Sequence, residues 1–160
     1  MNRKGIAAAA AVATTFVAGA PAWEAAAQDP NGRPVHGEIT LKTSFQPDPH
    51  PITLRAGGPV PAAQISPRCH GFITAAPSVR LQFDAAELPL RIEVASRADT
   101  VLVVNGPGGG WYCNDDGDGG RRPAVRFDRP EDGRYEIWVG TYRPGGAPPA
   151  ELRISEIDRR

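Results

Sequence analysis

The sequence predicts an all-β protein, a jelly-roll-like β-sandwich of about eight or nine antiparallel strands with one disulfide. Apolar residues recur with a period of two along most of the chain, which is the pattern of strands buried on one face. Segments rich in proline and glycine separate these stretches, and both residue types end strands. No stretch keeps a helical period of apolar residues, so the pattern favours two packed sheets over an α/β fold.

The expected strands follow one another at short intervals. The first covers residues 38–45, where Ile39, Leu41 and Phe45 alternate with polar neighbours. Further strands are expected at residues 52–55, 79–83, 90–94, 101–104, 125–127, 135–139 and 152–154. The turn segments are "PDPHP", "AGGPVP", "NGPGGG", "RPEDG" and "RPGGAPP".

Two of these strands carry additional information about their surroundings. Residues 101–104 are apolar without interruption, which is typical of a strand covered on both faces. Over residues 135–139 the alternation places Tyr135 on the core face and Trp138 on the opposite face. We expect the Tyr135 hydroxyl to be satisfied near the turn at residues 132–133.

Residues 1–27 have the features of a secretory signal peptide. A short basic start precedes an uncharged, Ala-rich run, and Ala25 and Ala27 provide a small-residue cleavage site. The run is too short and too weakly apolar to predict a membrane span. The alternative is a soluble Ala-rich helix. The signal predicts export, to the periplasm or beyond it.

The remainder of the chain is expected to form one domain. Residues 28–37 are polar with two prolines and suggest a flexible lead-in, and residues 38–160 have the length of a single β-sandwich. The chain has 18 basic and 18 acidic residues, so no net charge draws it to nucleic acid or to an anionic membrane.

Cys69 and Cys113 are the two cysteines of the chain. In an exported protein two cysteines predict one disulfide, although two free thiols are the alternative. The bond would close a loop of roughly 45 residues and stabilise the fold by about 3–4 kcal/mol in the chain-entropy model.

The segment "WYCNDDGDGG" at residues 111–120 brings several oxygen ligands together. Asn114, Asp116 and Asp118 occupy alternate positions and Gly119 follows, as in the first half of a calcium-binding loop. Carboxylates crowded at one bend repel one another, and oxygen ligands prefer calcium to zinc or copper. The sequence therefore predicts a structural calcium ion here. The alternative is a bare turn in which Asp and Asn side chains cap backbone amides.

Residues 69–156 resemble the bacterial pre-peptidase C-terminal domain. The resemblance is carried by "ADTVLVVNGPGGGWYCNDDGDGG", "FDRPEDGRYEIWVGTY" and "AELRISE". It implies a jelly-roll-like sandwich, and it makes Asn114, Asp115 and Asp116 candidate calcium ligands, with Asp99 as a further candidate. Such domains are usually appended to secreted proteases, where some help secretion or substrate attachment. With its cysteine pair and its "WYC-DD" loop, the chain resembles a free-standing exported subgroup of this family that is often labelled serine peptidase.

The serine peptidase label can be compared with the residues present. Residues 117–120 read Gly-Asp-Gly-Gly, which is the protease string Gly-Asp-Ser-Gly-Gly without its serine nucleophile. No serine lies in a G-x-S-x-G elbow, and each of His36, His50 and His70 stands in a loop-like context. We therefore expect a protein without catalytic residues.

Three aromatic residues are candidates for a ligand face: Trp138, Trp111 and Tyr142. An outward tryptophan can stack on a sugar ring or anchor a protein partner. The alternative is that a neighbouring loop or an arginine stem covers it.

The sequence as a whole predicts an exported, non-catalytic binding or accessory module. Its partner would be an extracellular protein or glycan, and the module is expected to be a monomer. Two alternatives stay open at this point, a serine peptidase and a purely structural envelope or matrix protein.

Overall fold

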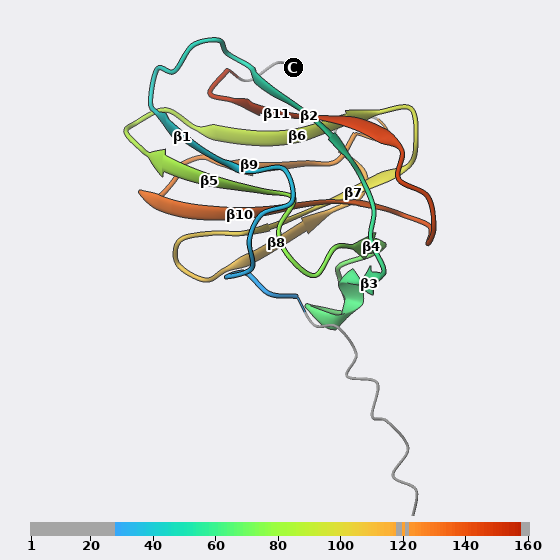
Figure 1. Cartoon of the computed structure of the whole chain (residues 1–160). Coiled ribbons are helices and arrows are strands. Elements are labelled where there is room, and N and C mark those ends of the chain that lie inside the picture. Colours follow the sequence, from blue (N-terminus) through green and yellow to red (C-terminus); the bar gives the residue numbers. More distant parts are fainter. Residues whose placement is uncertain (1–27, 118–119, 121, 158–160) are drawn as a thin grey trace, which may run out of the picture.

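The computed structural model describes residues 28–117, 120 and 122–157, so the expected signal peptide lies outside the described residues. The described chain forms two β-sheets packed face to face, which confirms the all-β prediction (Figure 1). Its strands are β1 Glu38–Lys42, β2 His50–Arg55, β3 Val60–Pro61, β4 Phe72–Ile73, β5 Val79–Asp84, β6 Leu90–Ser96, β7 Thr100–Asn105, β8 Trp111–Asn114, β9 Ala124–Phe127, β10 Gly133–Thr141 and β11 Pro149–Ser155.

The first sheet has seven strands and is built around the long strand β10. Strand β7 pairs with one edge of β10 and carries β8, while β5 and β4 pair with successive parts of the other edge. Strand β1 extends the sheet beyond β5, and β3 extends it beyond β4. The second sheet has four strands in the order β2-β11-β6-β9.

One pairing differs from the expected antiparallel arrangement. Strand β1 runs parallel to β5, with Glu38 opposite Arg80 and Lys42 opposite Asp84. Parallel neighbours need a long connection, and here the chain builds β2, β3 and β4 before it returns as β5. Every other strand pair in the described part of the chain is antiparallel.

The main core lies between the two sheets and follows the alternation in the sequence. Leu81, Tyr135 and Ile137 face Ile92 and Leu152 from the opposite sheet, and all five are buried. Burial of such side chains is the main stabilising contribution to a domain of this size.

A second, smaller core lies on the outer face of the seven-stranded sheet. Val101, Val103 and Trp138 pack there against a covering segment, residues 57–78, which includes β3, β4 and the short 3-10 helix Ala62–Gln64. Because Leu102 and Val104 enter the main core, β7 is buried on both faces, as its uninterrupted apolar run predicts.

Residues 28–37 are not the free lead-in expected from their composition. Backbone N–H groups of Asp29, Val35 and His36 donate to the carbonyls of Ala75, Pro77 and Ser78 at 2.7–2.9 Å. We call residues 28–37 the strap, because they lie across the outer face of the seven-stranded sheet beside the covering segment.

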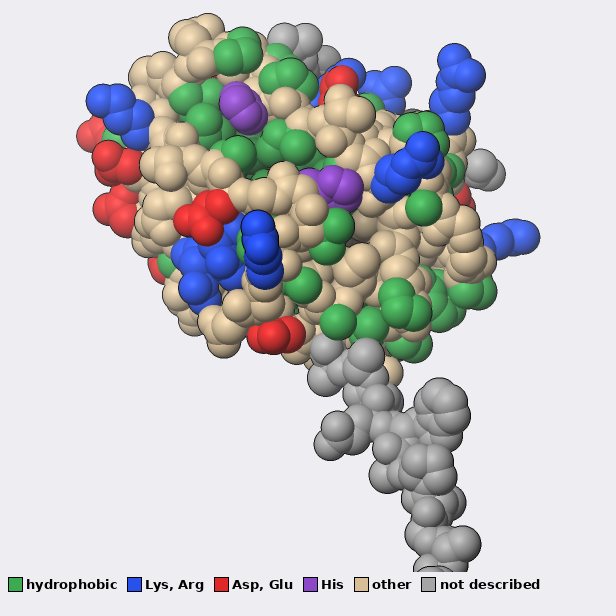
Figure 2. All heavy atoms as spheres, in the orientation of Figure 1, with side chains coloured by type: hydrophobic (Ala, Val, Ile, Leu, Met, Phe, Trp, Pro, Cys, Tyr) green, Lys and Arg blue, Asp and Glu red, His purple; other side chains and the backbone are tan. Residues whose placement is uncertain are grey.

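In the described residues, no helix has the length and hydropathy that crossing a membrane requires. The face of the molecule drawn in Figure 2 carries acidic and basic side chains in small groups, and neither sign of charge dominates it.

Candidate functional site

The acidic loop after β8 is tethered to the covering segment. The Cys69–Cys113 disulfide is present, with 5.3 Å between the two Cα atoms, which confirms the predicted pairing. It brings His70 next to the loop, where His70 Nδ1 lies 3.2 Å from Asp115 Oδ2. The loop is therefore held at its first turn by a covalent bond and by a polar contact.

The described members of the predicted calcium-ligand set each have different surroundings. Asn114 Oδ1 accepts a hydrogen bond from the Ala124 N–H at 3.1 Å, and Asp115 contacts His70. Asp116 is exposed, and Asp118 lies outside the described residues. Asp99 precedes β7, and its carbonyl accepts a hydrogen bond from the Tyr142 N–H.

Among the described residues, no three His, Cys, Asp or Glu side chains are grouped as a metal site requires. Asn114 caps the Ala124 amide, which is the kind of contact that the alternative interpretation, a turn capped by Asp and Asn side chains, describes. Calcium at this loop stays a prediction from the sequence.

The serines and histidines do not meet in a nucleophile–base pair among the described hydrogen bonds. Ser155 Oγ donates to Asp48 Oδ1 at 2.5 Å, and Ser78 Oγ accepts from the Val139 N–H at 3.0 Å. The buried Nδ1 of His50 has no hydrogen-bond partner within the described chain.

The expected ligand face at Trp138 needs correction, because Trp138 is fully buried. The parity of the strand was predicted correctly, since Trp138 does point away from the main core. The covering segment lies over it, however, and its Nε1 donates to the Ala75 carbonyl at 3.4 Å. Trp111 stacks on it with 5.3 Å between ring centroids.

Trp111 and Tyr142 are exposed but do not form one surface. Trp111 pairs with Asn105 at the end of β7, whereas the Tyr142 N–H bonds to Asp99 just before β7 begins. The six residues of β7 separate these two ends of the strand, which corresponds to roughly 20 Å.

The structure instead gathers aromatic side chains at one end of the sandwich. Tyr112 is 43% exposed and packs edge-on against Phe127, with 4.9 Å between ring centroids. Phe127 packs in the same way against the buried Tyr135 at 5.2 Å. These rings border a pocket of about 200 Å³, which we call the aromatic pocket.

A glycine-rich turn forms one wall of the aromatic pocket. It connects β7 to β8 over residues 106–110, and Asn105 Nδ2 donates to the carbonyls of Gly109 and Gly110. Gly109 has φ +78°, a conformation that favours glycine. A Cβ at Gly108 would lie 3.2 Å from Glu131 Oε2, so glycine leaves room for that carboxylate.

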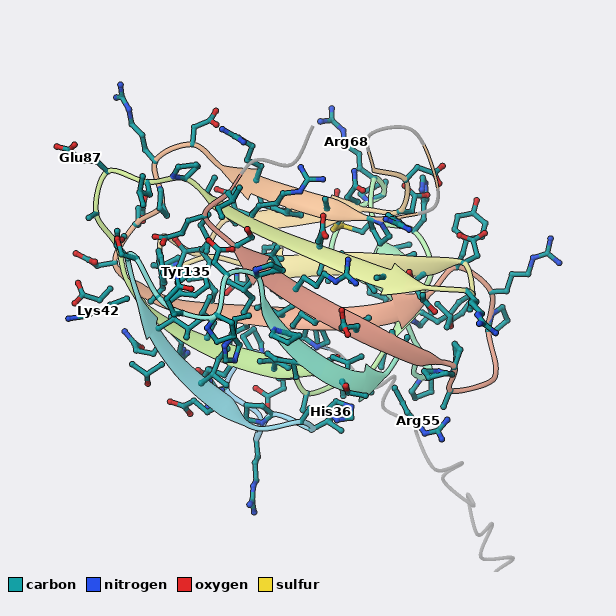
Figure 3. All side chains as sticks on the ribbon, turned by 90° about the horizontal axis from the view of Figure 1, so that it is seen from above. His36, Lys42, Arg55, Arg68, Glu87 and Tyr135 are labelled. Atoms are coloured by element: carbon teal, nitrogen blue, oxygen red, sulfur yellow. A yellow bond between two sulfur atoms is a disulfide. The ribbon has the colours of Figure 1, made fainter. Side chains whose placement is uncertain are left out.

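The opposite wall is the loop between β9 and β10, and Tyr135 fixes it. The Tyr135 hydroxyl donates to the Glu131 carbonyl at 2.8 Å and accepts from the Glu131 N–H at 3.0 Å. Figure 3 shows Tyr135 within the body of the sandwich, whereas Arg68 and Glu87 lie at its periphery. Burial raises the pKa of Tyr135 to about 12, so the hydroxyl stays protonated and keeps both bonds at neutral pH.

Two charged side chains at the aromatic pocket are available to a ligand. Arg129 and Glu131 line it, both are exposed, and neither side chain forms an ion pair or hydrogen bond within the described residues. This site was not predicted from the sequence, because its walls come from two separate turns, residues 106–110 and 128–132. The adjacent aromatics Trp111 and Tyr112 after a glycine run were the available signal.

No family model matches this chain, and no curated protein matches it. Among solved structures, it is similar to the pre-peptidase C-terminal domain of a collagenase from Bacillus anthracis. That likeness has 17% sequence identity and a TM-score of 0.46, and it covers 78% of this chain and 100% of that domain.

The chain is also similar to a periplasmic inhibitor of g-type lysozyme from Aeromonas hydrophila. Here the identity is 17% and the TM-score is 0.38, with 74% of this chain and 96% of the inhibitor covered.

Proposed function

We propose that this protein is an exported, non-catalytic binding module that takes one ring of a neutral saccharide into the aromatic pocket. The observation that carries the proposal is the convergence of the exposed Tyr112 with the unpaired Arg129 and Glu131 around one preformed pocket.

The size of the aromatic pocket limits what it can hold. Ligand sites for drug-sized molecules span about 300–1,000 Å³, so a pocket of about 200 Å³ is suited to a single ring. The exposed Tyr112 ring supplies a flat apolar surface, and the apolar face of a sugar can pack on such a ring.

The charges at the rim favour a neutral polyhydroxy ligand. The Arg129 guanidinium offers donors and the Glu131 carboxylate offers acceptors, which together match hydroxyl groups that both donate and accept. An ionic ligand would be attracted by one of the two side chains and repelled by the other.

Export is part of the proposal and has independent support. The Cys69–Cys113 disulfide is typical of proteins that fold in an oxidising compartment. The Ala-rich segment at residues 1–27 has the composition of a signal peptide.

The proposal is tested by titrating the exported chain with neutral oligosaccharides and measuring binding by calorimetry and by NMR shifts. We expect binding in the range of about 10 μM to 1 mM, with Tyr112→Ala weakening it at least about tenfold. Glu131→Gln is expected to weaken it less, because an amide can still accept from a hydroxyl.

The matched control is Tyr142→Ala, which removes a tyrosine of similar exposure at the other end of the sandwich. It should leave saccharide affinity unchanged. Binding of proline-rich peptides instead of saccharides would replace the proposed ligand class. Absence of any binding would favour the structural envelope or matrix protein.

A further inference from the structure

The outer face of the four-stranded sheet carries a second hollow, at the opposite end of the sandwich from the aromatic pocket. It is lined by residues 95–98, Arg122, residues 148–151 and Thr53, and it has a volume of about 740 Å³. We call it the arginine groove. Strand β7, which is about 20 Å long, begins beside Ala98 at the groove and ends beside the aromatic pocket.

Small and cyclic side chains produce this hollow. In the sheet register Thr53 lies opposite Glu151, and Glu151 lies opposite Ala95. Ala95 contributes only a methyl group to a row that otherwise carries longer side chains. Together with Ala95, Pro148 and Pro149 form an apolar floor in the groove.

Elsewhere on this face the charges are paired. Arg153 Nε lies 2.6 Å from Glu151 Oε1, and Arg91 Nε lies 3.1 Å from Glu93 Oε2. Glu93 also lies 3.8 Å from Arg153, which links the two pairs into one network. The Glu151 carboxylate at the groove is thus already engaged.

Arg97 and Arg122 at the groove, in contrast, are not paired with a carboxylate of the described residues. Both are exposed, and neither guanidinium forms a hydrogen bond or an ion pair within the described residues. Two unpaired guanidinium groups beside an apolar floor attract a carboxylate and can bind it through two parallel hydrogen bonds.

We propose that the arginine groove binds an acidic peptide segment of a partner protein, in which a carboxylate neighbours an apolar side chain. The carboxylate pairs with Arg97 or Arg122, and the apolar side chain packs on Ala95 and Pro149. The groove lining contains no aromatic ring, which favours a peptide over an acidic sugar, because sugar rings are usually recognised by stacking. With the aromatic pocket at the other end, the module could connect two partners.

The test measures fluorescence anisotropy of a labelled peptide that alternates leucine and glutamate, titrated with the full exported chain. A matched peptide with glutamine in place of glutamate, and polygalacturonate as an acidic saccharide, complete the set. We expect the acidic peptide to bind, and Arg97→Gln combined with Arg122→Gln to weaken binding about tenfold or more. Raising the salt concentration should also weaken it.

Arg68→Gln is the control, because Arg68 is an exposed arginine outside the groove, at the periphery of the fold (Figure 3). It should leave the affinity unchanged, and an equal loss would show that binding follows overall charge. Tighter binding of polygalacturonate than of the peptide would overturn the ligand class. Equal binding of the glutamate and glutamine peptides would overturn the role of the arginines, and absence of binding to all three probes would overturn the site.

Discussion

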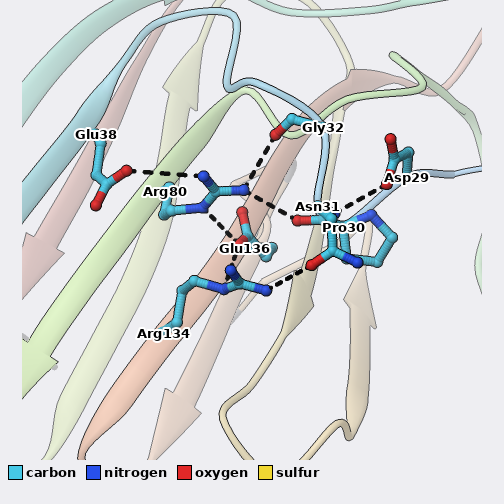
Figure 4. Close-up of polar contacts among 8 residues, drawn as sticks. All are labelled: Asp29, Pro30, Asn31, Gly32, Glu38, Arg80, Arg134 and Glu136. Atoms are coloured by element: carbon cyan, nitrogen blue, oxygen red, sulfur yellow. Dashed lines mark hydrogen bonds and ion pairs between the residues drawn. The ribbon is translucent and has the colours of Figure 1, made fainter.

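Arg80 Nε lies 2.6 Å from Glu136 Oε1, and this ion pair is buried on the outer face of the seven-stranded sheet. Arg134 Nε approaches the same carboxylate oxygen at 2.8 Å. Arg80 Nη2 donates to the carbonyls of Pro30 and Gly32 in the strap, and Nη1 lies 3.7 Å from Glu38 Oε2 in β1 (Figure 4). The hydrogen bond to Glu136 raises the pKa of Arg80 above its usual high value, so the pair stays ionised.

Substitution Arg80→Leu should destabilise the fold by about 3–5 kcal/mol, because it leaves the buried Glu136 carboxylate without its main partner. The strap should also loosen, since two of its carbonyls lose their donor. Denaturant unfolding measures the first effect. Hydrogen exchange at the Val35 and His36 amides, which bond to Pro77 and Ser78, measures the second.

Arg153→Leu is the comparison for this prediction. Arg153 pairs with Glu151 at the same 2.6 Å, but about a third of each side chain is exposed, so its loss should cost less than about 1 kcal/mol. Equal losses for the two variants would contradict the role assigned to burial at Glu136.

From the raised pKa of Tyr135 we expect the protein to lose stability in alkaline solution. Its pKa is raised from 10.0 to about 12 in the folded protein, mainly by burial. Above pH 10 the unfolded chain releases this proton while the folded protein retains it. The protonated Tyr135 hydroxyl therefore makes its full contribution to the free energy of unfolding below pH 10. This contribution, up to about 3 kcal/mol, is lost as the pH rises towards 12. Urea unfolding at a series of pH values measures the slope.

In Tyr135→Phe this slope should become shallower than in the wild type. The variant should also lose about 1–2 kcal/mol at neutral pH, because the Glu131 N–H and carbonyl lose their common partner. An unchanged alkaline slope would assign the titration to another group.

The alternation of apolar residues was enough to predict the longer strands of both sheets, because burial on one face requires a period of two. Residues 101–104 and Tyr135 occupy the positions expected from that pattern, and the Tyr135 hydroxyl bonds to the backbone of Glu131 near the predicted turn. The covering segment was not predictable in this way. Residues 57–78 pack through short, irregular pieces without a repeating pattern, so the sequence offered a loop covering Trp138 only as an alternative and did not identify which segment covers it.

The bonded strap and the aromatic pocket were not predicted from the sequence for a different reason. Residues 28–37 have a polar composition that is typical of a flexible tail, but Arg80 and Arg134 require acceptors and the strap provides them. The aromatic pocket depends on the approach of Gly108 to Glu131, across two turns. Such contacts depend on topology, which local sequence patterns do not specify.

Removal of the disulfide tests how the covering segment is held. Replacing both Cys69 and Cys113 by alanine should cost about 2–4 kcal/mol, because 44 residues separate the two ends of the closed loop. Trp111 and Trp138 lie beside this bond, so tryptophan fluorescence should report the change. A double variant with wild-type stability would show that packing alone holds the segment.

Calcium at the acidic loop is the last prediction from the sequence. Extracellular calcium modules bind at about 0.1–1 mM, so 5 mM calcium should raise the melting temperature by about 4–8 °C relative to chelator. Asp116→Asn should remove the difference, because Asp116 is the candidate carboxylate without a protein partner in the described loop. His70→Ala provides the control, since it removes the contact to Asp115 and leaves every acidic side chain in place. If calcium leaves the wild-type melting temperature unchanged while His70→Ala lowers it, the loop is a turn held by the protein alone.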